Sequence, residues 1–272
     1  MRNSFAAAIL IALLWAFTMS AQTSYVRDSI LVVPSGVRQI PARAFADRMD
    51  FIGVEFENPC TVKEIGDYAF LGCKRLRTIE LPEGVAALGQ GSFRECESLR
   101  EVKLPATLTR LPRYAFAWCV GLERAEGATR LTDIGAHAFA YCRELKSFSF
   151  PCSLEHIGSN AFSFCRSLTE VSLPSSIKEL ESYAFSECLS LRKASLPANS
   201  HLLGELIFSG CRAMEEITEL SAMPPKFDCE STLFEMTETQ MYERCHLIVK
   251  GGREEVYRRA SGWKLFRNIS SR

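Results

Sequence analysis

The sequence predicts an α/β solenoid, a right-handed coil of repeating units with parallel strands on one face and short helical turns on the other. Seven cysteines stand 23 residues apart, and self-similarity at such a fixed period indicates a repeat architecture. A phenylalanine lies three residues before each cysteine, and Phe45 adds an eighth phenylalanine upstream. These structural ladder residues are Phe70, Cys73, Phe93, Cys96, Phe116, Cys119, Phe139, Cys142, Phe162, Cys165, Phe185, Cys188, Phe208 and Cys211.

Each unit contains two periodicities. Val102 and Leu104 alternate with polar residues, as in a half-buried strand, and Pro105 ends that strand because proline has no N–H for the ladder. The spacing Ala-Phe-x-x-Cys-x-x-Leu predicts one or two turns of helix, and glycines such as Gly89 allow the turn that enters it. A unit this short cannot bury its own apolar face, so we expect the units to stack with their strands parallel.

The first 21 residues have the features of an export signal. Arg2 gives a positive start, residues 6–17 form an apolar run, and Ser20-Ala21 offers small residues for cleavage. The run is too short to span a bilayer comfortably, and no later apolar stretch is long enough to return the chain to a membrane. Residues 1–21 are therefore expected to be a signal peptide, with a retained anchor as the alternative because Met19 is large where a small residue is usual. The mature protein is expected in the periplasm, at the cell surface or outside the cell.

The mature chain divides into two parts. Residues 22–222 are expected to form about eight 23-residue coils. After residue 222 the pattern stops, and Pro224-Pro225 opens a segment that contains a predicted helix from Arg253 to Ala260. Since the end of a solenoid must be closed by atypical sequence, residues 223–272 are expected to be a C-terminal capping segment.

Composition and motifs argue against several function classes. The formal net charge is zero, which does not favour nucleic acid as a partner. The four histidines lie in different coils at unrelated repeat positions, and no nucleophile elbow or phosphate loop occurs. Metal-ligand spacings such as CxxC are also missing. We therefore expect neither an enzyme, nor a metal, nor a cofactor, and no catalytic residues are assigned.

The regular cysteines are expected to be buried thiols rather than disulfides. Stacked cysteines on one face point the same way, whereas a bridge needs Cβ atoms that approach each other. Cys60 and Cys152 hold equivalent places four coils apart, too far to bond. Cys229 and Cys245 share the cap, and either a bridge between them or two free thiols is consistent with the sequence.

Leu-Pro, Ile-Gly-x-x-Ala-Phe-x-x-Cys and Leu-x-x-Val-x-Leu elements, together with the tail from Cys245 to Ile269, resemble the BspA-like, or treponemal-type, leucine-rich repeat family. The resemblance covers about residues 30–269. It departs at Gly127-Ala128, which replaces Leu-Pro, and at Ser200, where an apolar residue is expected. The resemblance implies a leucine-rich repeat solenoid, exported by a host-associated microbe, that acts as an adhesin or a protein-binding surface.

Two surfaces are candidate ligand-binding sites. The strand face has a serine-rich middle that includes Ser147, Ser149 and Ser172, although strands show polar residues to water in any case. Two residues after the ladder phenylalanine, consecutive coils carry Trp118, Tyr141 and Phe164, which we expect to form an aromatic ladder on the helical side. Helical geometry makes this position half covered. Tyr114 and His137, two residues before their phenylalanines, are expected to extend it.

The sequence leads to one main functional hypothesis and two alternatives. The main hypothesis is a monomeric, exported protein that mediates protein–protein interaction, adhering to a host or cell-surface component. One alternative is a small apolar ligand bound in a cavity near Ala125 and Gly127, where the next coil has Phe148 and Phe150; the better-supported expectation is that these large residues fill that space. The other alternative is an envelope scaffold.

Overall fold

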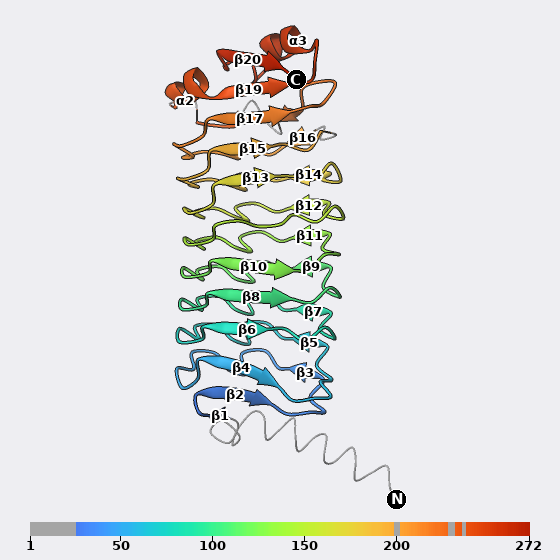
Figure 1. Cartoon of the computed structure of the whole chain (residues 1–272), viewed down its shortest axis with the longest axis vertical. Coiled ribbons are helices and arrows are strands. Elements are labelled where there is room, and N and C mark those ends of the chain that lie inside the picture. The colour runs from blue at the N-terminus through green and yellow to red at the C-terminus, as the bar shows by residue number, and fades with distance from the viewer. Residues whose placement is uncertain (1–25, 199–201, 228–231, 236–237) are drawn as a thin grey trace, which may run out of the picture.

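The computed structural model describes residues 26–198, 202–227, 232–235 and 238–272. The coils stack along one long axis, and their strands form two columns (Figure 1). The leader and Cys229 lie outside the described residues, so the cleavage site and the predicted cap bridge stay predictions. No helix in the described part of the chain has the length and apolar character needed to cross a membrane.

The first column is a main sheet of parallel strands, closed at its N-terminal end by one antiparallel strand. Alternation of buried and exposed residues, as in β8, explains why these segments form strands. Its first half contains β1 (Val26–Arg27), β2 (Ile30–Val33), β4 (Gly53–Phe56), β6 (Thr78–Glu80), β8 (Glu101–Leu104) and β10 (Arg124–Gly127). Its second half contains β13 (Glu170–Ser172), β15 (Lys193–Ser195), β17 (Glu216–Glu219), β19 (His246–Val249) and β20 (Asn268–Ser271).

The main sheet is interrupted at the fifth coil, which corrects the prediction of a continuous strand face. Residues 145–150, which include Ser147 and Ser149, form no strand, and β10 and β13 belong to separate sheets. The rings of Phe148 and Phe150 turn inward, with the Phe148 centroid 5.2 Å from that of Phe139. Two large rings fill space that small or aliphatic residues occupy in neighbouring coils, and the ladder is not continued there.

A second column of two-residue strands was missed by the sequence analysis. Each strand precedes the residue that is glycine in most coils, and two residues are too short to show an alternating pattern. These strands pair in parallel and in register within two sheets, which are separated between the third and fourth coils. They are β3 (Gln39–Ile40), β5 (Glu64–Ile65), β7 (Ala87–Leu88), β9 (Arg110–Leu111), β11 (Asp133–Ile134), β12 (His156–Ile157), β14 (Glu179–Leu180), β16 (Leu202–Leu203) and β18 (Lys226–Phe227).

The segment around each ladder phenylalanine is a series of tight turns, and the predicted helical turns do not form. In the second coil Ala69, Leu71 and Cys73 donate backbone hydrogen bonds to carbonyls three residues back, while Tyr68 and Phe70 donate to the next coil. A helix would keep these bonds within the segment. Positions two before and two after the phenylalanine also have positive φ, which a right-handed helix excludes.

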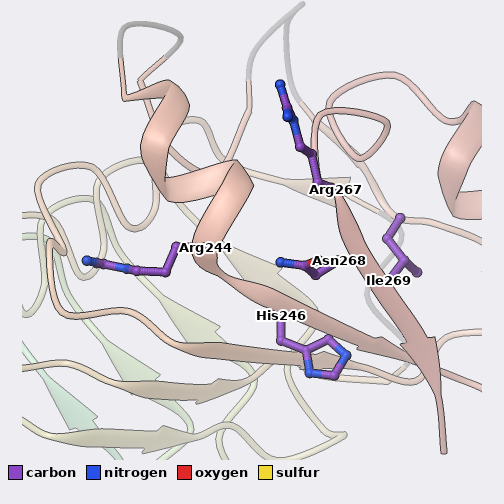
Figure 2. A pocket seen from close by; sticks show the side chains of 5 residues that line it. All are labelled: Arg244, His246, Arg267, Asn268 and Ile269. Atoms are coloured by element: carbon purple, nitrogen blue, oxygen red, sulfur yellow. The ribbon is translucent and has the colours of Figure 1, made fainter.

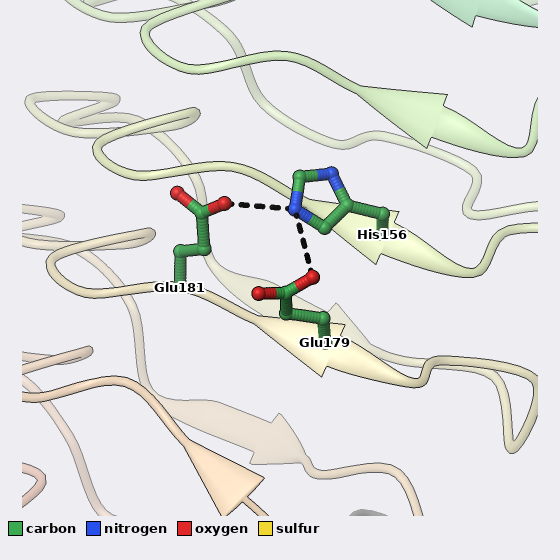
Figure 3. A group of neighbouring side chains, drawn as sticks. All are labelled: His156, Glu179 and Glu181. Carbon is green, nitrogen blue, oxygen red and sulfur yellow. Dashed lines mark hydrogen bonds and ion pairs between the residues drawn. The ribbon is translucent and has the colours of Figure 1, made fainter. Parts of the chain in front are cut away.

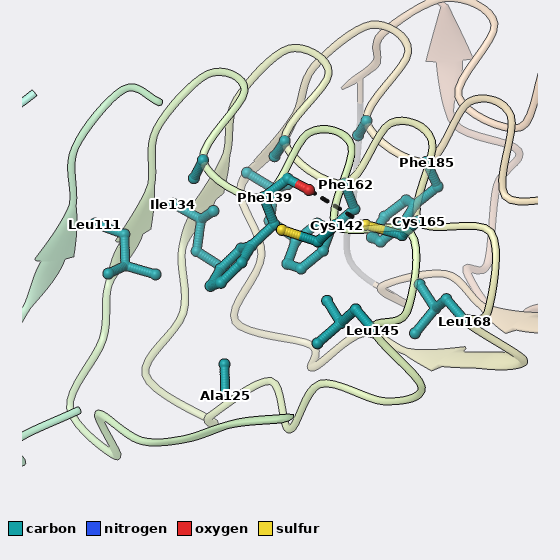
Figure 4. Packing of buried hydrophobic residues seen from close by; sticks show 14 of the residues in the cluster. Leu111, Ala125, Ile134, Phe139, Cys142, Leu145, Phe162, Cys165, Leu168 and Phe185 are labelled. Atoms are coloured by element: carbon teal, nitrogen blue, oxygen red, sulfur yellow. Dashed lines mark hydrogen bonds between the residues drawn. The ribbon is translucent and has the colours of Figure 1, made fainter. Parts of the chain in front are cut away.

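The interior is a continuous stack of phenylalanine rings beside a row of thiols (Figure 4). Phe116, Phe139 and Phe162 are fully buried, and successive centroids lie 5.4 and 5.2 Å apart. Each ladder thiol donates to the carbonyl of the preceding coil's phenylalanine, as Cys142 does to Phe116 at 3.2 Å. This row is a hydrogen-bonded column, beyond the apolar filler that we expected, and its cysteines are unpaired.

The C-terminal segment extends the main sheet and fills the end of the core. Strand β19 pairs in parallel with β17, and β20 pairs in parallel with β19. The ring of Phe234 lies 6.4 Å from that of Phe208 and so continues the phenylalanine row. Helices α2 (Thr239–Arg244) and α3 (Glu254–Arg259) flank these strands, and α3 agrees with the predicted helix. Trp263 is fully buried and donates its indole N–H to the carbonyl of Pro225.

Candidate functional site

Trp118, Tyr141 and Phe164 form the predicted aromatic row. Their rings stack almost in parallel, with centroids 3.8 Å apart for the first pair and 4.3 Å for the second. Trp118 is 38% exposed, and the other two side chains are half-buried. The row is therefore partly covered, as the sequence predicted, although the reason is a tight turn and not helical geometry.

The backbone at all three positions is left-handed. Trp118, Tyr141 and Phe164 have φ of 64°, 64° and 62°. This region costs an L-residue roughly 1–2 kcal/mol and is favoured by glycine, because the Cβ atom crowds the following carbonyl oxygen. Gly72 and Gly210 occupy the equivalent place in the second and eighth coils. The solenoid therefore forms this turn without an aromatic residue.

Tyr114 and His137 make a second, separate stack. Their ring centroids lie 4.8 Å apart, and the described ring contacts do not join this pair to the aromatic row. The Arg113 guanidinium lies 5.0 Å from the Tyr114 centroid. Burial, and then the charge of Arg113, lower the pKa of His137, so its imidazole is neutral at neutral pH. The predicted extension of the row is thus a neighbouring stack of its own.

The strand face carries ion pairs and a shallow hollow. Lys103 Nζ lies 2.5 Å from Glu80 Oε1, and both side chains are well exposed. A hollow of about 360 Å³ follows β6 and β8 and reaches Arg124 and Glu126. Ser172 is exposed on β13 beside Ser195, but Ser147 and Ser149 are exposed outside any strand. The structure therefore does not bring the three predicted serines into one sheet surface.

A second hollow, of about 520 Å³, lies on the capping segment (Figure 2). Arg244, His246, Arg267, Asn268 and Ile269 line it. The two arginine side chains extend in different directions in Figure 2, and each is engaged elsewhere. Arg244 donates to the carbonyl of Arg212, and Arg267 lies 2.9 Å from Glu243 Oε1. The guanidinium groups do not converge on a common anion position.

The ladder thiols have the chemistry of core residues. Cys142 and Cys165 are fully buried, and desolvation raises the pKa of both thiols well above the usual range. A thiol reacts as its thiolate, and burial suppresses that form here. The row is therefore unsuited to nucleophilic chemistry.

The structure also brings together a polar cluster that the sequence analysis missed. His156, Glu179 and Glu181 converge on the second column of strands (Figure 3). Asp133 lies on the other side of the imidazole. His156 and Glu179 are 23 residues apart, so the repeat period itself places them side by side. That period was the signal that would have revealed the cluster.

Comparison with known families agrees with this architecture. Residues 27–144 and 132–224 match a family described as BspA type leucine rich repeat region, in six copies. Fold and repeat together define a leucine-rich repeat solenoid. The chain belongs to the BspA-type leucine-rich repeat family, as the sequence resemblance indicated. A search of curated proteins found no significant match.

The chain is also similar to solved structures from several bacteria. A leucine-rich repeat protein of T. pallidum is 26% identical, with a TM-score of 0.48, over 75% of this chain and 84% of that one. A leucine-rich cell surface protein of Faecalibacterium prausnitzii is 19% identical, with a TM-score of 0.50, over 89% of this chain and 79% of that one. A leucine-rich repeat protein of Bacteroides ovatus is 22% identical, with a TM-score of 0.43, over 78% and 64%.

Proposed function

We propose that this protein is exported and adheres to a protein ligand, a host or cell-surface component, through the aromatic row of Trp118, Tyr141 and Phe164. One observation carries the proposal. Three consecutive coils place large aromatic rings at a left-handed position that is glycine in two other coils.

The left-handed turn itself does not favour aromatic residues. Three residues in the left-handed region cost together about 3–6 kcal/mol relative to glycine. The two stacking contacts return about 1–3 kcal/mol beyond ordinary burial. Partial burial of the rings adds a gain of the same order as the remaining cost, so stability alone does not select aromatic residues here, and Trp118 keeps 38% of its surface open to a partner.

The row has the composition of an interface centre. Tyrosine and tryptophan are enriched at residues that dominate binding energy, and such residues are surrounded by polar groups that exclude water. Here Glu95 and Glu187 occupy the equivalent positions in the coils on either side, and the Arg166 guanidinium lies 5.9 Å from the Phe164 centroid. A partner that covers the half-exposed rings completes their burial, and little conformational entropy is lost because stacking already holds the rings in place.

The class of protein and the expected leader support the same role. Repeat solenoids present extended surfaces to which partners bind. The Faecalibacterium prausnitzii structure is named as a cell surface protein, in keeping with the export signal expected in residues 1–21. A binding role, with no catalytic step, therefore suits the exposed aromatic row and the unreactive core thiols.

A panel of purified matrix and cell-surface proteins tests the proposal. Mature protein is immobilised, and binding to each panel member is measured by biolayer interferometry. For a panel member that binds, the pair Trp118→Ala/Tyr141→Ala should weaken the affinity by at least about tenfold, the effect of losing one dominant side chain. The control pair Glu170→Ala/Lys193→Ala changes exposed neighbours on the strand face and should leave binding unchanged.

The outcomes separate the two surfaces. Loss of binding in the control pair alone would move the site to the strand face. If no panel member binds, adhesion to these components is wrong. Circular dichroism and thermal melting of each variant show whether the solenoid is intact.

A further inference from the structure

The polar cluster on the second column of strands has a geometry that a metal ion requires. His156 Nε2 lies 2.8 Å from Glu181 Oε1 and 3.5 Å from Glu179 Oε2. One nitrogen therefore faces both carboxylates, as Figure 3 shows. Ligands of a tetrahedral zinc ion, with bonds of about 2.0 Å, lie about 3.3 Å apart. The two distances from His156 Nε2 are close to that spacing, and all three donor atoms lie within 4.8 Å of one another.

The opposite side of the imidazole is also occupied in the way that metal-binding histidines require. Asp133 Oδ1 lies 3.4 Å from His156 Nδ1. A histidine that binds a metal commonly directs its other ring nitrogen to a carboxylate, which fixes the ring orientation and strengthens the ligand. The parallel register of β11, β12 and β14 places Asp133, His156 and Glu179 side by side. The fold itself thus aligns the carboxylate, the imidazole and the second carboxylate.

Glu181 departs from the repeat in a way that the fold does not explain. The equivalent position holds Pro41, Gly66, Gly89, Pro112, Gly135, Gly158 and Gly204 in the other described coils. A Cβ atom at Gly158 would lie only 2.6 Å from the backbone nitrogen of Ala136, and one at Gly204 only 2.2 Å from that of Ser182. Adjacent backbones approach closely at these glycines, whereas Pro41 and Pro112 show that the turn also accommodates a Cβ atom; Glu181 is the one residue of this set that carries a charge.

The Glu181 carboxylate is held so that one oxygen faces the imidazole. Its Oε2 atom accepts hydrogen bonds from the Ser159 backbone N–H at 2.8 Å and from the Ser159 hydroxyl at 2.6 Å. Its Oε1 atom is the one directed at His156. A side chain in a glycine position, fixed by two hydrogen bonds and aimed at a histidine, is an ordered ligand group and not a freely solvated charge.

From this geometry we propose that His156, Glu179 and Glu181 bind a zinc ion, with Asp133 as the positioning residue behind the imidazole. One imidazole nitrogen with carboxylate oxygens suits zinc or a similar transition metal, whereas calcium and magnesium favour oxygen ligands alone. All four side chains retain contact with solvent, so an ion can enter and water can complete its coordination. The proposal is independent of the aromatic row.

Titration of the mature chain with zinc chloride, followed by isothermal calorimetry at neutral pH, tests the site. The accessible thiols are alkylated first, because thiolates also bind zinc. One zinc ion per chain should bind, and calcium chloride should give no comparable signal. Glu181→Gly restores the repeat's own residue and so preserves the fold, yet it should weaken zinc binding at least about tenfold. Asp133→Asn should weaken it by about 10–100-fold.

Control variants distinguish a zinc site from a cluster of charged side chains that binds no metal. Glu155 is next to His156 in sequence but pairs with Lys178 at 2.7 Å, so Glu155→Gln should bind zinc like the wild type. His156→Ala should abolish the signal, and its melting temperature should no longer rise with zinc. Absence of stoichiometric binding, or binding unchanged in both Glu181→Gly and His156→Ala, would overturn the proposal.

Discussion

The turn that carries the aromatic row predicts an unusual ranking of two variants at Glu95. This residue holds the same left-handed position as Trp118, with φ of 63°, and Gly72 occupies that position in the coil before it. Its backbone N–H donates to the carbonyl of Ala117 at 2.8 Å. The side chain lies 3.1 Å from Arg94, and either Glu95→Gly or Glu95→Ala removes that contact. Comparing the two variants with each other therefore isolates the backbone.

The magnitude follows from two opposing effects. Glycine relieves about 1–2 kcal/mol of left-handed strain that alanine keeps. It loses about 0.4–1 kcal/mol because the unfolded glycine chain has more conformational freedom. Glu95→Gly should therefore be more stable than Glu95→Ala by roughly 0.5–1 kcal/mol. In a helical segment the ranking reverses, with alanine favoured by about 1 kcal/mol.

Urea denaturation, monitored by far-UV circular dichroism, measures this difference. The two variants should show the same slope of free energy against urea concentration and a higher midpoint for Glu95→Gly. A higher midpoint for Glu95→Ala would refute the left-handed turn and restore the helical interpretation of the sequence.

Thiol reagents should modify the exposed Cys152 in the native protein and leave the buried ladder thiols unmodified until the protein is denatured. Mass spectrometry counts the modified thiols, and rapid labelling of any ladder thiol in the native protein would contradict the closed core. Burial raises the pKa of Glu219 from 4.5 to about 7. The fold then keeps a proton that the unfolded chain releases, so the free energy of unfolding should fall by up to about 3 kcal/mol as pH rises through this window, and Glu219→Gln should flatten the profile. Gly127→Ala should cost about 2–3 kcal/mol in urea denaturation, because φ is +94° and the new Cβ would meet the Leu104 carbonyl oxygen; the open position of Gly251 supplies a control that should change little.

Much of the architecture was predictable because it repeats. The 23-residue period determines stacking, and the alternation in segments such as residues 101–104 identifies the main strands. The stacked phenylalanines and the unpaired thiols follow from the same register. Strand loss at residues 147–150 had a visible signal in Phe148 and Phe150, but only the packed core shows that both rings turn inward.

The prediction of helical turns was wrong because the spacing of apolar residues in the sequence does not distinguish a helix from consecutive tight turns. Buried residues spaced by three occur both in a helix and in consecutive turns, where each turn closes a bond to the residue three back. Aromatic side chains at Trp118 and Tyr141 do not indicate positive φ, and the available signal was glycine at the equivalent position in two other coils, Gly72 and Gly210. The position of the aromatic row was right, and its backbone was not.

The polar cluster was missed because motifs were sought along the chain. Asp133, His156 and Glu179 are consecutive only when the sequence is read every 23 residues, and Glu181 stands out only against the glycines of the other coils. The distance of 2.8 Å between His156 and Glu181 depends on side-chain conformations that sequence does not specify.

The affinity of one bound panel protein for wild-type protein and for Trp118→Ala/Tyr141→Ala tests the central functional claim most directly. The proposal predicts that the dissociation constant of the double variant is at least about tenfold larger than that of the wild type, with the circular dichroism spectrum unchanged. An unchanged affinity in a correctly folded pair would contradict it.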